Sequence, residues 1–286
     1  MAEPLRVGTC SWKYPSWKGL VYSAESGVDF LSEYSARYNT VEVDQWFWTL
    51  PEYEVAAQYA HVTPPGFRFS VKLPNALTLT HLRGKKIQGL KPNPEFLSVD
   101  VYRDVLARLS GLTEKLGILM LQFEYMPREK MPSQAEFLSS LARFLAEVPR
   151  EIPLGIETRN PRWLDERYFR FLAEHDVAHV FLQGYFMPSV LEVYHDFGRL
   201  LRGSVVVRLH GPDRAGIEEA TGERWDTIVE PKDQELPGIA EMVNQMLGRS
   251  LTVYLNVNNH YEGSAPLTIE RLRRHGLAER AEEPDE

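Results

Sequence analysis

Eight short apolar segments recur along the chain, and the sequence between them is long enough for a helix each time. They span residues 6–12, 40–45, 67–73, 117–123, 153–158, 179–183, 204–211 and 251–259. Apolar residues at helical spacing are clearest in 28–38, 101–116, 134–148, 166–175 and 236–247. Regular alternation of strand and helix is typical of parallel βα units. Eight such units in about 250 residues predict an α/β fold, a single (β/α)8 TIM-type barrel of parallel strands inside outer helices.

An open doubly wound sheet is the alternative arrangement of such units. It usually carries a glycine-rich phosphate loop after its first strand, and none follows residues 6–12 here. The lack of that loop also disfavours dinucleotide and standard nucleotide cofactors. We therefore expect one barrel domain over residues 1–275. The remainder, 276–286, ends in the acidic stretch AERAEEPDE and is expected to be a disordered tail.

The charge and cysteine content bear on partners and location. The formal net charge of −8 gives no excess of positive charge to favour nucleic acid or an anionic membrane. No apolar run reaches the length of a membrane span, and the N-terminus lacks the apolar core of a signal peptide. Cys10 is the single cysteine, so no intramolecular disulfide can form. We expect a cytoplasmic protein with a small-molecule substrate, and the sequence leaves its oligomeric state open.

Several strands end in polar side chains that share one face. Alternate side chains of a strand point to opposite faces, so Arg208 and His210 lie together in the segment SVVVRLHG (204–211). The same parity pairs Glu42 with Asp44, Ser70 with Lys72, Gln122 with Met120, and Glu157 with Arg159. In a barrel these faces look inward, and the carboxyl ends of the strands form the active-site face. We predict that these charges meet there, either around a ligand or as a structural cluster of ion pairs.

Seven motifs carry a resemblance to a known family. They are GTCSWKYPSWKGLVY (8–22), YNTVEVDQWFWTLP (38–51), FRFSVKLPNALTLTH (67–81), LQF (121–123), GIETRNPRW (155–163), VVRLHG (206–211) and NNHYEGSAP (258–266). In this order they resemble the blocks of the uncharacterised YecE-like family, domain of unknown function 72, over about residues 6–272. The resemblance implies a TIM-type barrel and no established reaction. Cys10-Ser11 stands where the family usually has Ser-Gly, and Asn160 where it often has histidine, so the rim of the pocket is expected to differ within the family.

These residues favour an enzyme that acts by acid/base chemistry on a small polar or anionic metabolite, a sugar or sugar phosphate. Glu42, Lys72, Glu157 and His210 are the predicted catalytic residues, because carboxylates, amines and imidazoles transfer protons. The predicted substrate-binding residues offer guanidinium forks, amides and rings, and they are Trp12, His81, Gln122, Arg159, Arg208, Asn258 and Asn259. Trp17, Trp46 and Trp48 are further candidates for stacking on a sugar or base. A retaining glycosidase would need two carboxyl groups about 5 Å apart, and the sequence does not fix the separation of Glu42 and Glu157.

Two alternatives belong to other functional classes. The first is a divalent-metal-dependent hydrolase or isomerase, in which carboxylate and imidazole groups bind Mg, Mn or Zn; the candidates are Glu42, Asp44, Glu157, His210 and His260. No other cofactor is predicted, and no HExxH motif or cysteine cluster identifies the metal ligands. The second is a non-catalytic ligand-binding or nucleic-acid adaptor protein. Its contacts would be Arg83, Lys85, Lys86 and Lys91 in the long segment 74–100, although such a charge run is usually a solvated loop.

We assign no functional role to the remaining histidines or to the cysteine. Cys10 is embedded in a strand and is interpreted as a small core residue. Five histidines lie on helices or at their edges and are expected at the surface: His61, His175, His179, His195 and His275.

Overall fold

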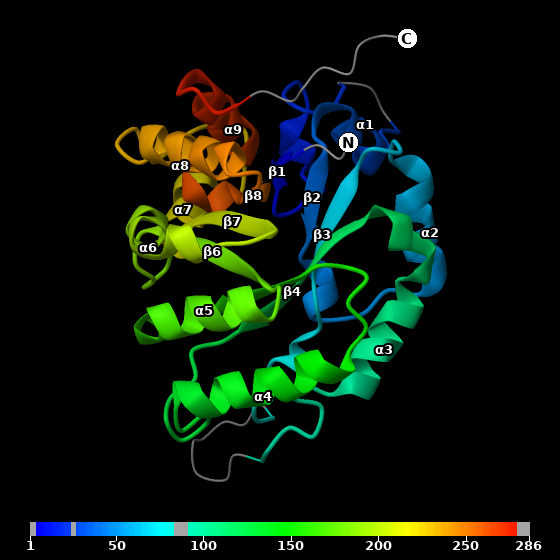
Figure 1. The fold of residues 1–286 in the computed structure, drawn as a ribbon. Coiled ribbons are helices and arrows are strands. Elements are labelled where there is room, and N and C mark those ends of the chain that lie inside the picture. Colours follow the sequence, from blue (N-terminus) through cyan, green and yellow to red (C-terminus); the bar gives the residue numbers. More distant parts are fainter. Residues whose placement is uncertain (1–3, 24–26, 83–90, 279–286) are drawn as a thin grey trace.

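The eight apolar segments form one parallel barrel in the computed structural model, which describes residues 4–23, 27–82 and 91–278 (Figure 1). The strand order is β1-β8-β7-β6-β5-β4-β3-β2. The strands are β1 (Leu5–Thr9), β2 (Thr40–Val43), β3 (Arg68–Lys72), β4 (Leu116–Phe123), β5 (Leu154–Thr158), β6 (Ala178–Gly184), β7 (Ser204–Gly211) and β8 (Thr252–Val257). The predicted barrel is confirmed. Several strands end earlier than expected, and β1 ends at Thr9 rather than at residue 12.

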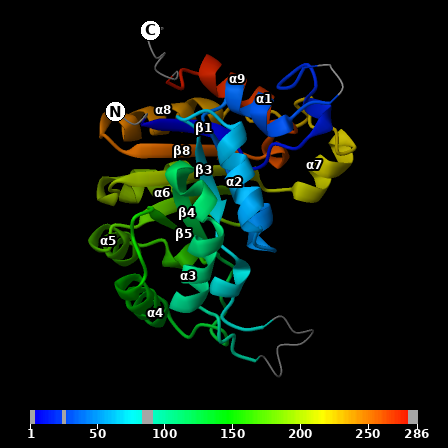
Figure 2. The same ribbon diagram turned by 90° about the vertical axis from the view of Figure 1, so that its right-hand side faces the viewer.

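Helices lie outside the strands (Figures 1 and 2). They are α1 (Phe30–Arg37), α2 (Tyr53–Val62), α3 (Val99–Arg108), α4 (Gln134–Glu147), α5 (Glu166–Glu174), α6 (Val190–Phe197), α7 (Arg214–Thr221), α8 (Leu236–Gly248) and α9 (Ala265–Arg274). Side-chain oxygens of Asp29, Ser133 and Asp165 cap α1, α4 and α5 by accepting backbone N–H groups. None of the described helices is long and apolar enough to cross a membrane.

The single helix expected over 101–116 is wrong in its second half. α3 ends at Arg108, and a 3-10 helix spans Ser110–Lys115. Gly111 in this turn lies against α2, where an added Cβ would be 2.9 Å from the Cβ of Ala57. Leu112 is buried in the core at the same turn. The chain keeps its apolar pattern there, but the close approach to α2 favours the tighter helix.

The barrel has two apolar layers. The outer one, between strands and helices, contains residues such as Val41, Phe69 and Val207. The inner one is a separate cluster that fills the barrel, and it consists of Ile118, Met120, Ala178, Val180, Val206 and Tyr254. Gly117 makes room for the Tyr254 ring, because an added Cβ would be 2.5 Å from the Tyr254 hydroxyl oxygen. The inner cluster occupies the strand positions that the parity predicts to face inward.

Side chains, in place of a backbone ladder, join β1 to β2, and we call this place the seam. The carboxamide of Asn39 accepts a hydrogen bond from Val7 N at 2.8 Å and donates to Leu5 O at 2.9 Å. The hydroxyl of Tyr34 accepts from Thr9 N at 2.8 Å and donates to the β2 carbonyl of Thr40 at 3.1 Å. These buried groups satisfy β1 backbone atoms that would otherwise lack partners. The seam closes the cylinder and fixes the ends of β1 and β2 side by side.

The long segment after β3 is tied down next to the barrel. The side chain of Asn93 donates to the carbonyls of Ala76 and Leu79, both at 2.7 Å. An isolated antiparallel bridge pairs His81 with Pro92. Three of the cations proposed as nucleic-acid contacts (Arg83, Lys85 and Lys86) lie outside the described residues, and so does most of the expected tail, 279–286. Lys91 is described and exposed.

Candidate functional site

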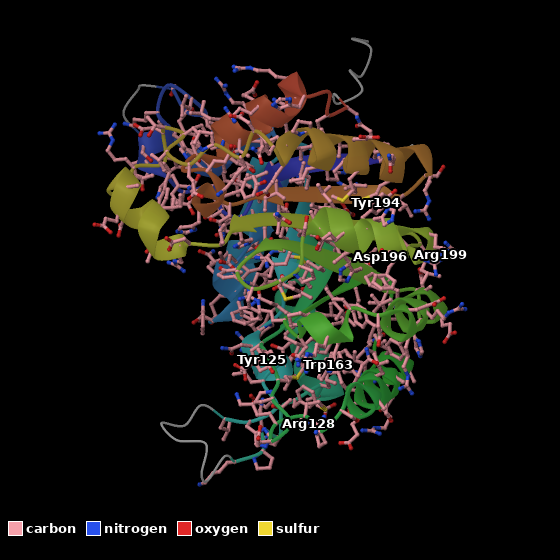
Figure 3. All side chains as sticks on the ribbon, turned by 90° about the vertical axis from the view of Figure 1, so that its left-hand side faces the viewer. Tyr125, Arg128, Trp163, Tyr194, Asp196 and Arg199 are labelled. Atoms are coloured by element: carbon pink, nitrogen blue, oxygen red, sulfur yellow. The ribbon has the colours of Figure 1, made fainter. Side chains whose placement is uncertain are left out.

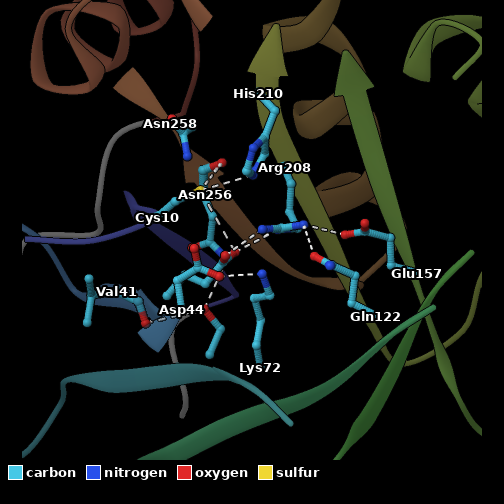
Figure 4. A network of polar contacts seen from close by, with 12 residues as sticks. Cys10, Val41, Asp44, Lys72, Gln122, Glu157, Arg208, His210, Asn256 and Asn258 are labelled. Carbon is cyan, nitrogen blue, oxygen red and sulfur yellow. Dashed lines mark hydrogen bonds and ion pairs between the residues drawn. The ribbon is translucent and has the colours of Figure 1, made fainter. Parts of the chain in front are cut away.

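Arg208 is the centre of a polar network inside the mouth of the barrel (Figure 4). Its side chain comes from β7 and is 1 % exposed. The guanidinium donates to both carboxylate oxygens of Glu42 on β2, from Nε to Oε2 at 2.7 Å and from Nη2 to Oε1 at 2.6 Å. Nη1 forms an ion pair with Glu157 on β5 and donates to Gln122 Oε1 on β4 at 3.2 Å. One buried cation on β7 thus joins side chains from three other strands.

The two carboxylates on Arg208 have opposite pKa shifts. Burial raises the pKa of Glu42, and the opposing charge of Arg208 does not fully offset it. Burial also raises the pKa of Glu157, but the charges of Arg208 and Arg159 outweigh it and bring that pKa down to about 2. Glu157 is therefore firmly ionised, whereas Glu42 is the carboxylate closer to accepting a proton.

Two further cations lie at the outer edge of this network. Lys72 on β3 forms an ion pair with Asp44, and its Nζ is 4.6 Å from the centroid of the Phe47 ring. Arg159 follows β5 and donates from Nε to Glu157 Oε1 at 3.0 Å. The side chains of Asp44 and Arg159 are 44 % and 20 % exposed, whereas that of Arg208 is buried. The network therefore has a buried floor and an accessible rim that carries both signs of charge.

Cys10 and His210 form a second group beside Arg208. The Cys10 sulfur lies 3.5 Å from His210 Nε2 and 3.8 Å from Glu42 Oε2. Burial, reinforced by the nearby charge of Arg208, holds the pKa of His210 well below its usual value. Burial and the Glu42 carboxylate raise the pKa of the Cys10 thiol. Cys10 is buried, as its interpretation as a core residue requires, but that interpretation missed its contact with two polar site residues.

Sequence reasoning missed two more members of the site. Asn256 on β8 donates from Nδ2 to Ser70 Oγ at 3.0 Å and to Glu42 Oε2 at 3.4 Å. It shares the inward parity of Tyr254, two positions earlier, and that was the signal available. Tyr185 follows β6, and its ring lies 4.6 Å from Arg159 Cζ and 5.9 Å from the His210 ring centroid. Position 185 follows a strand end but carries no charge, so the parity of charged residues did not identify it.

The backbone at the ends of β6 and β7 holds Tyr185 in place. Gly184 has φ of +133°, and an added Cβ there would be 2.3 Å from Gly211 O. Tyr185 donates its backbone N–H to that same oxygen at 3.1 Å and has φ of +54°, a left-handed conformation that is uncommon for a bulky side chain. This turn directs the Tyr185 ring over Arg159 and His210.

Four predicted substrate-binding residues have structural partners around the network. Trp12 is buried and packs edge-on against Tyr59, with ring centroids 5.2 Å apart. His81 contacts Thr80 Oγ1 at 3.0 Å. Asn259 is buried, and its side chain accepts a hydrogen bond from Ala265 N at 2.8 Å. Asn258 binds the backbone and ring of His260 and lies near Cys10 (Figure 4). Among the described residues, no hydrogen bond joins Trp12, His81 or Asn259 to the Arg208 network.

Apolar side chains gather on the same end of the barrel. Within the described part of the chain, the large apolar residues that stay exposed lie in segments that follow β2, β3, β4 and β6, and they are Trp48, Tyr53, Val55, Leu82, Tyr125 and Phe186. The rings of Tyr125 (Figure 3) and Phe186 contact edge to face at 6.2 Å. Trp17 and Trp46, two stacking candidates, are instead buried in the core. Trp48, at 60 % exposure, is the candidate that remains accessible.

The group of possible metal ligands differs from the predicted one. Among the described residues, one group of His, Cys and carboxylate side chains has ligand atoms all within 4.8 Å, and it is Cys10, Glu42 and His210. The other candidates have partners elsewhere: Asp44 on Lys72, Glu157 on two arginines, and His260 beside Asn258 and Glu218. Two expected ligands and one unexpected thiol thus come together.

Comparison with known proteins agrees with this fold. The structure resembles a DUF72 family protein from Enterococcus faecalis, with 19% identity, 99% coverage of both chains and a TM-score of 0.68. It also resembles a DUF72 family protein from Thermotoga maritima, with 23% identity, 94% coverage of this chain, 98% of the other and a TM-score of 0.68. No curated protein matches the chain. The family model described as "Protein of unknown function DUF72" matches residues 6–285, so the chain belongs to the DUF72 family.

Proposed function

We propose that this protein is an enzyme that acts by acid/base chemistry on a small polar or anionic metabolite, such as a sugar phosphate, at the C-terminal end of the barrel. The observation that carries the proposal is the network itself: a buried arginine joins four strands beneath a rim of accessible charged groups. Buried ion pairs contribute little net stability, so stability alone does not account for this network. Barrel enzymes bind their substrates at this end.

The rim residues bind the substrate in this proposal. Arg159 presents a partly exposed guanidinium that Glu157 holds through Nε, which leaves its other N–H groups for an anion. Tyr185 packs its ring against the same guanidinium and helps to hold it in position for the substrate. Gln122, which contacts Arg208, binds a polar group further inside the mouth.

The proton-transfer roles belong to Lys72 and Asp44 at the rim, above the predicted carboxylates. Their ion pair is partly accessible, so either member can exchange its partner for a substrate group. Glu42 is 0 % exposed beneath Arg208, so its proposed role is to position that guanidinium and not to touch the substrate. Glu157 positions Arg159 and Arg208 in the same way. His210 lies beside this network as a neutral imidazole.

A ligand screen with two variants tests this proposal. The chain would be titrated with a panel of sugar phosphates, free sugars and carboxylates while its thermal midpoint is followed. A ligand present at 100 times its Kd stabilises a protein by about 2.7 kcal/mol, which is easily measured. We expect an anionic member of the panel to raise the midpoint, and Arg159→Gln to weaken that response at least about tenfold, in line with the loss of a charge-assisted hydrogen bond.

Arg143→Gln is the matched control, because Arg143 is exposed on α4 and its guanidinium donates hydrogen bonds to two serines of the same helix. The binding proposal fails if no compound raises the midpoint, or if Arg159→Gln and Arg143→Gln respond alike. Compounds that bind would then be followed by NMR for turnover, with Lys72→Met as the second variant. Binding without turnover by the unmodified chain would favour the non-catalytic ligand-binding alternative over the enzyme.

A further inference from the structure

Three ligand atoms from three different strands face one another beside Arg208. Cys10 directly follows β1, Glu42 lies on β2 and His210 on β7. The Cys10 sulfur is 3.5 Å from His210 Nε2 and 3.8 Å from Glu42 Oε2, and the three atoms lie within 4.8 Å of one another. All three residues are buried, with exposures of 4 %, 0 % and 7 %. The chain therefore brings a thiol, a carboxylate and an imidazole together away from bulk water.

More acceptor atoms surround the Cys10 thiol than its single hydrogen can reach at once, although Glu42 Oε2 also accepts hydrogen bonds from Arg208 and Asn256. A thiol has one hydrogen, yet Glu42 Oε2, His210 Nε2 and the Asn256 carbonyl oxygen all lie within 3.8 Å of the Cys10 sulfur. The thiol can donate to one of them. Electron pairs on sulfur, oxygen and nitrogen that converge in a buried place are stabilised by a cation between them.

The distances from the Cys10 sulfur to the other two ligand atoms fit the tetrahedral coordination of a zinc-class ion. Bonds of about 2.3 Å to sulfur and about 2.0–2.2 Å to nitrogen or oxygen, at tetrahedral angles, place neighbouring ligand atoms about 3.5 Å apart. The Cys10 sulfur lies 3.5 Å from His210 Nε2 and 3.8 Å from Glu42 Oε2. A thiolate and an imidazole select zinc and similar late transition metals over magnesium or calcium, which prefer oxygen ligands.

The neighbours of these atoms orient them as the neighbours of metal ligands do. Arg208 donates to both oxygens of Glu42 and fixes the plane of its carboxylate. Asn256 Nδ2 lies 3.4 Å from Glu42 Oε2 and 3.0 Å from Ser70 Oγ. Hydrogen bonds of this kind hold ligating carboxylates in position in metalloproteins.

We propose that Cys10, Glu42 and His210 bind one zinc-class divalent cation, whose fourth position takes a water molecule or a substrate oxygen. Binding releases the thiol proton to solvent and forms a metal–thiolate bond. The carboxylates of Glu42, Asp44 and Glu157 balance the cations Lys72, Arg159 and Arg208, so a divalent ion with a thiolate leaves one positive charge. This inference rests on the proposed function in one respect: that charge favours an anionic substrate, whose oxygen the ion would polarise.

Cobalt serves as the spectroscopic probe of the site. Tag-free full-length protein, stripped with a chelator, would be titrated with Co²⁺ and separately with Zn²⁺, and bound metal measured by elemental analysis. We expect one equivalent of either ion and a thiolate-to-cobalt charge-transfer band in the near ultraviolet. The chain has one cysteine, so such a band assigns the sulfur without ambiguity. Zn²⁺ should displace Co²⁺ and abolish the band.

Variants separate this site from adventitious binding. Cys10→Ser should lose the charge-transfer band and bind Zn²⁺ at least about 100-fold more weakly, and His210→Gln should weaken Zn²⁺ to a similar degree. His195→Gln is the matched control, since His195 is exposed on α6. Thermal midpoints of the stripped variants show whether each is folded. Substoichiometric metal in the unmodified chain, or equal affinity in Cys10→Ser, overturns the proposal.

The metal measurement is made without metabolites, and the ligand screen of the proposed function can be repeated in chelator. A chain that binds no metal but still responds to an anionic metabolite would overturn the cation site alone. A chain that binds one zinc through Cys10 but responds to no metabolite, with or without the metal, would overturn the proposed function and leave the cation site standing.

Discussion

Arg208 shows how a β-strand carries a charge into the interior of a protein. Its neighbours Val207 and Leu209 pack outward and are fully buried, which leaves the alternate position to face the axis of the barrel. There it satisfies two carboxylates and a carboxamide. Glu42 and Glu157 are each at most 2 % exposed, and the guanidinium of Arg208 is the cation that both share.

Removal of the guanidinium should therefore destabilise the protein strongly. Arg208→Met leaves two carboxylates buried, and we expect the free energy of unfolding to fall by about 3–5 kcal/mol in urea titrations at pH 7. If Glu42 and Glu157 are also replaced by methionine, the triple variant should recover a large part of that loss. Arg143→Gln should stay within about 0.5 kcal/mol of the unmodified chain. A single Arg208→Met variant as stable as that control would refute the dependence.

His179 is a buried titratable residue outside this network, and the prediction that it lies at the surface is wrong. It lies on β6, is 3 % exposed, and its ring packs against Phe169 and Phe181. It follows Ala178 and precedes Val180, which both face the inner cluster, so its own side chain points outward under the helices. Burial lowers the pKa of His179 to about 3.

This pKa sets the direction of a pH effect on stability. The ordinary pKa of histidine is about 6.5, so the unfolded chain binds a proton before the folded one as the pH falls. Stability should decline from pH 6.5 toward pH 3, by about 1.4 kcal/mol per pH unit from this residue. His179→Phe should flatten the dependence of unfolding free energy on pH between 6.5 and 4, whereas His195→Gln should not. Equal slopes for all three chains would contradict the assignment.

At the scale of elements, the seam between β1 and β2 depends on two side chains. The Asn39 side chain forms hydrogen bonds with one backbone N–H and one backbone C=O of β1. The Tyr34 hydroxyl links β1 to the carbonyl of Thr40. A Cβ on Gly8 would lie 2.0 Å from Thr40 O, so the strands approach too closely there for any larger residue. Cys10 directly follows β1 and Glu42 lies on β2, so the seam also sets the distance between these two residues.

Disruption of the seam should be visible at individual amides. Asn39→Ala leaves Val7 N–H and Leu5 C=O without these partners, and we expect a loss of about 2–4 kcal/mol. Native-state hydrogen exchange should accelerate at the amide of Val7. Tyr34→Phe is the reciprocal control, because it should expose the amide of Thr9 and leave that of Val7 protected. Unchanged exchange at Val7 in Asn39→Ala would show that the carboxamide is dispensable.

At the scale of the whole molecule, the strand and helix pattern was sufficient to predict the barrel. The alternation of apolar segments depends on local periodicity, which a sequence displays directly. The boundaries were less predictable, as the 3-10 turn over Ser110–Lys115 shows, because contact with α2 decided them. The expected division into a domain over residues 1–275 and a disordered tail over 276–286 stays a prediction.

The sequence by itself determined which side chains alternate toward the axis, since strand geometry has a period of two. This parity placed Glu42, Lys72, Glu157 and Arg208 on one face of their strands. Only the tertiary structure decided which of them pair, because pairing depends on strand order, register and closure of the seam. Cys10 and His210 are 200 positions apart in the sequence, yet β8 alone lies between β1 and β7 in the sheet. Contacts across such a distance follow from the closed sheet, and local patterns carry no signal of them.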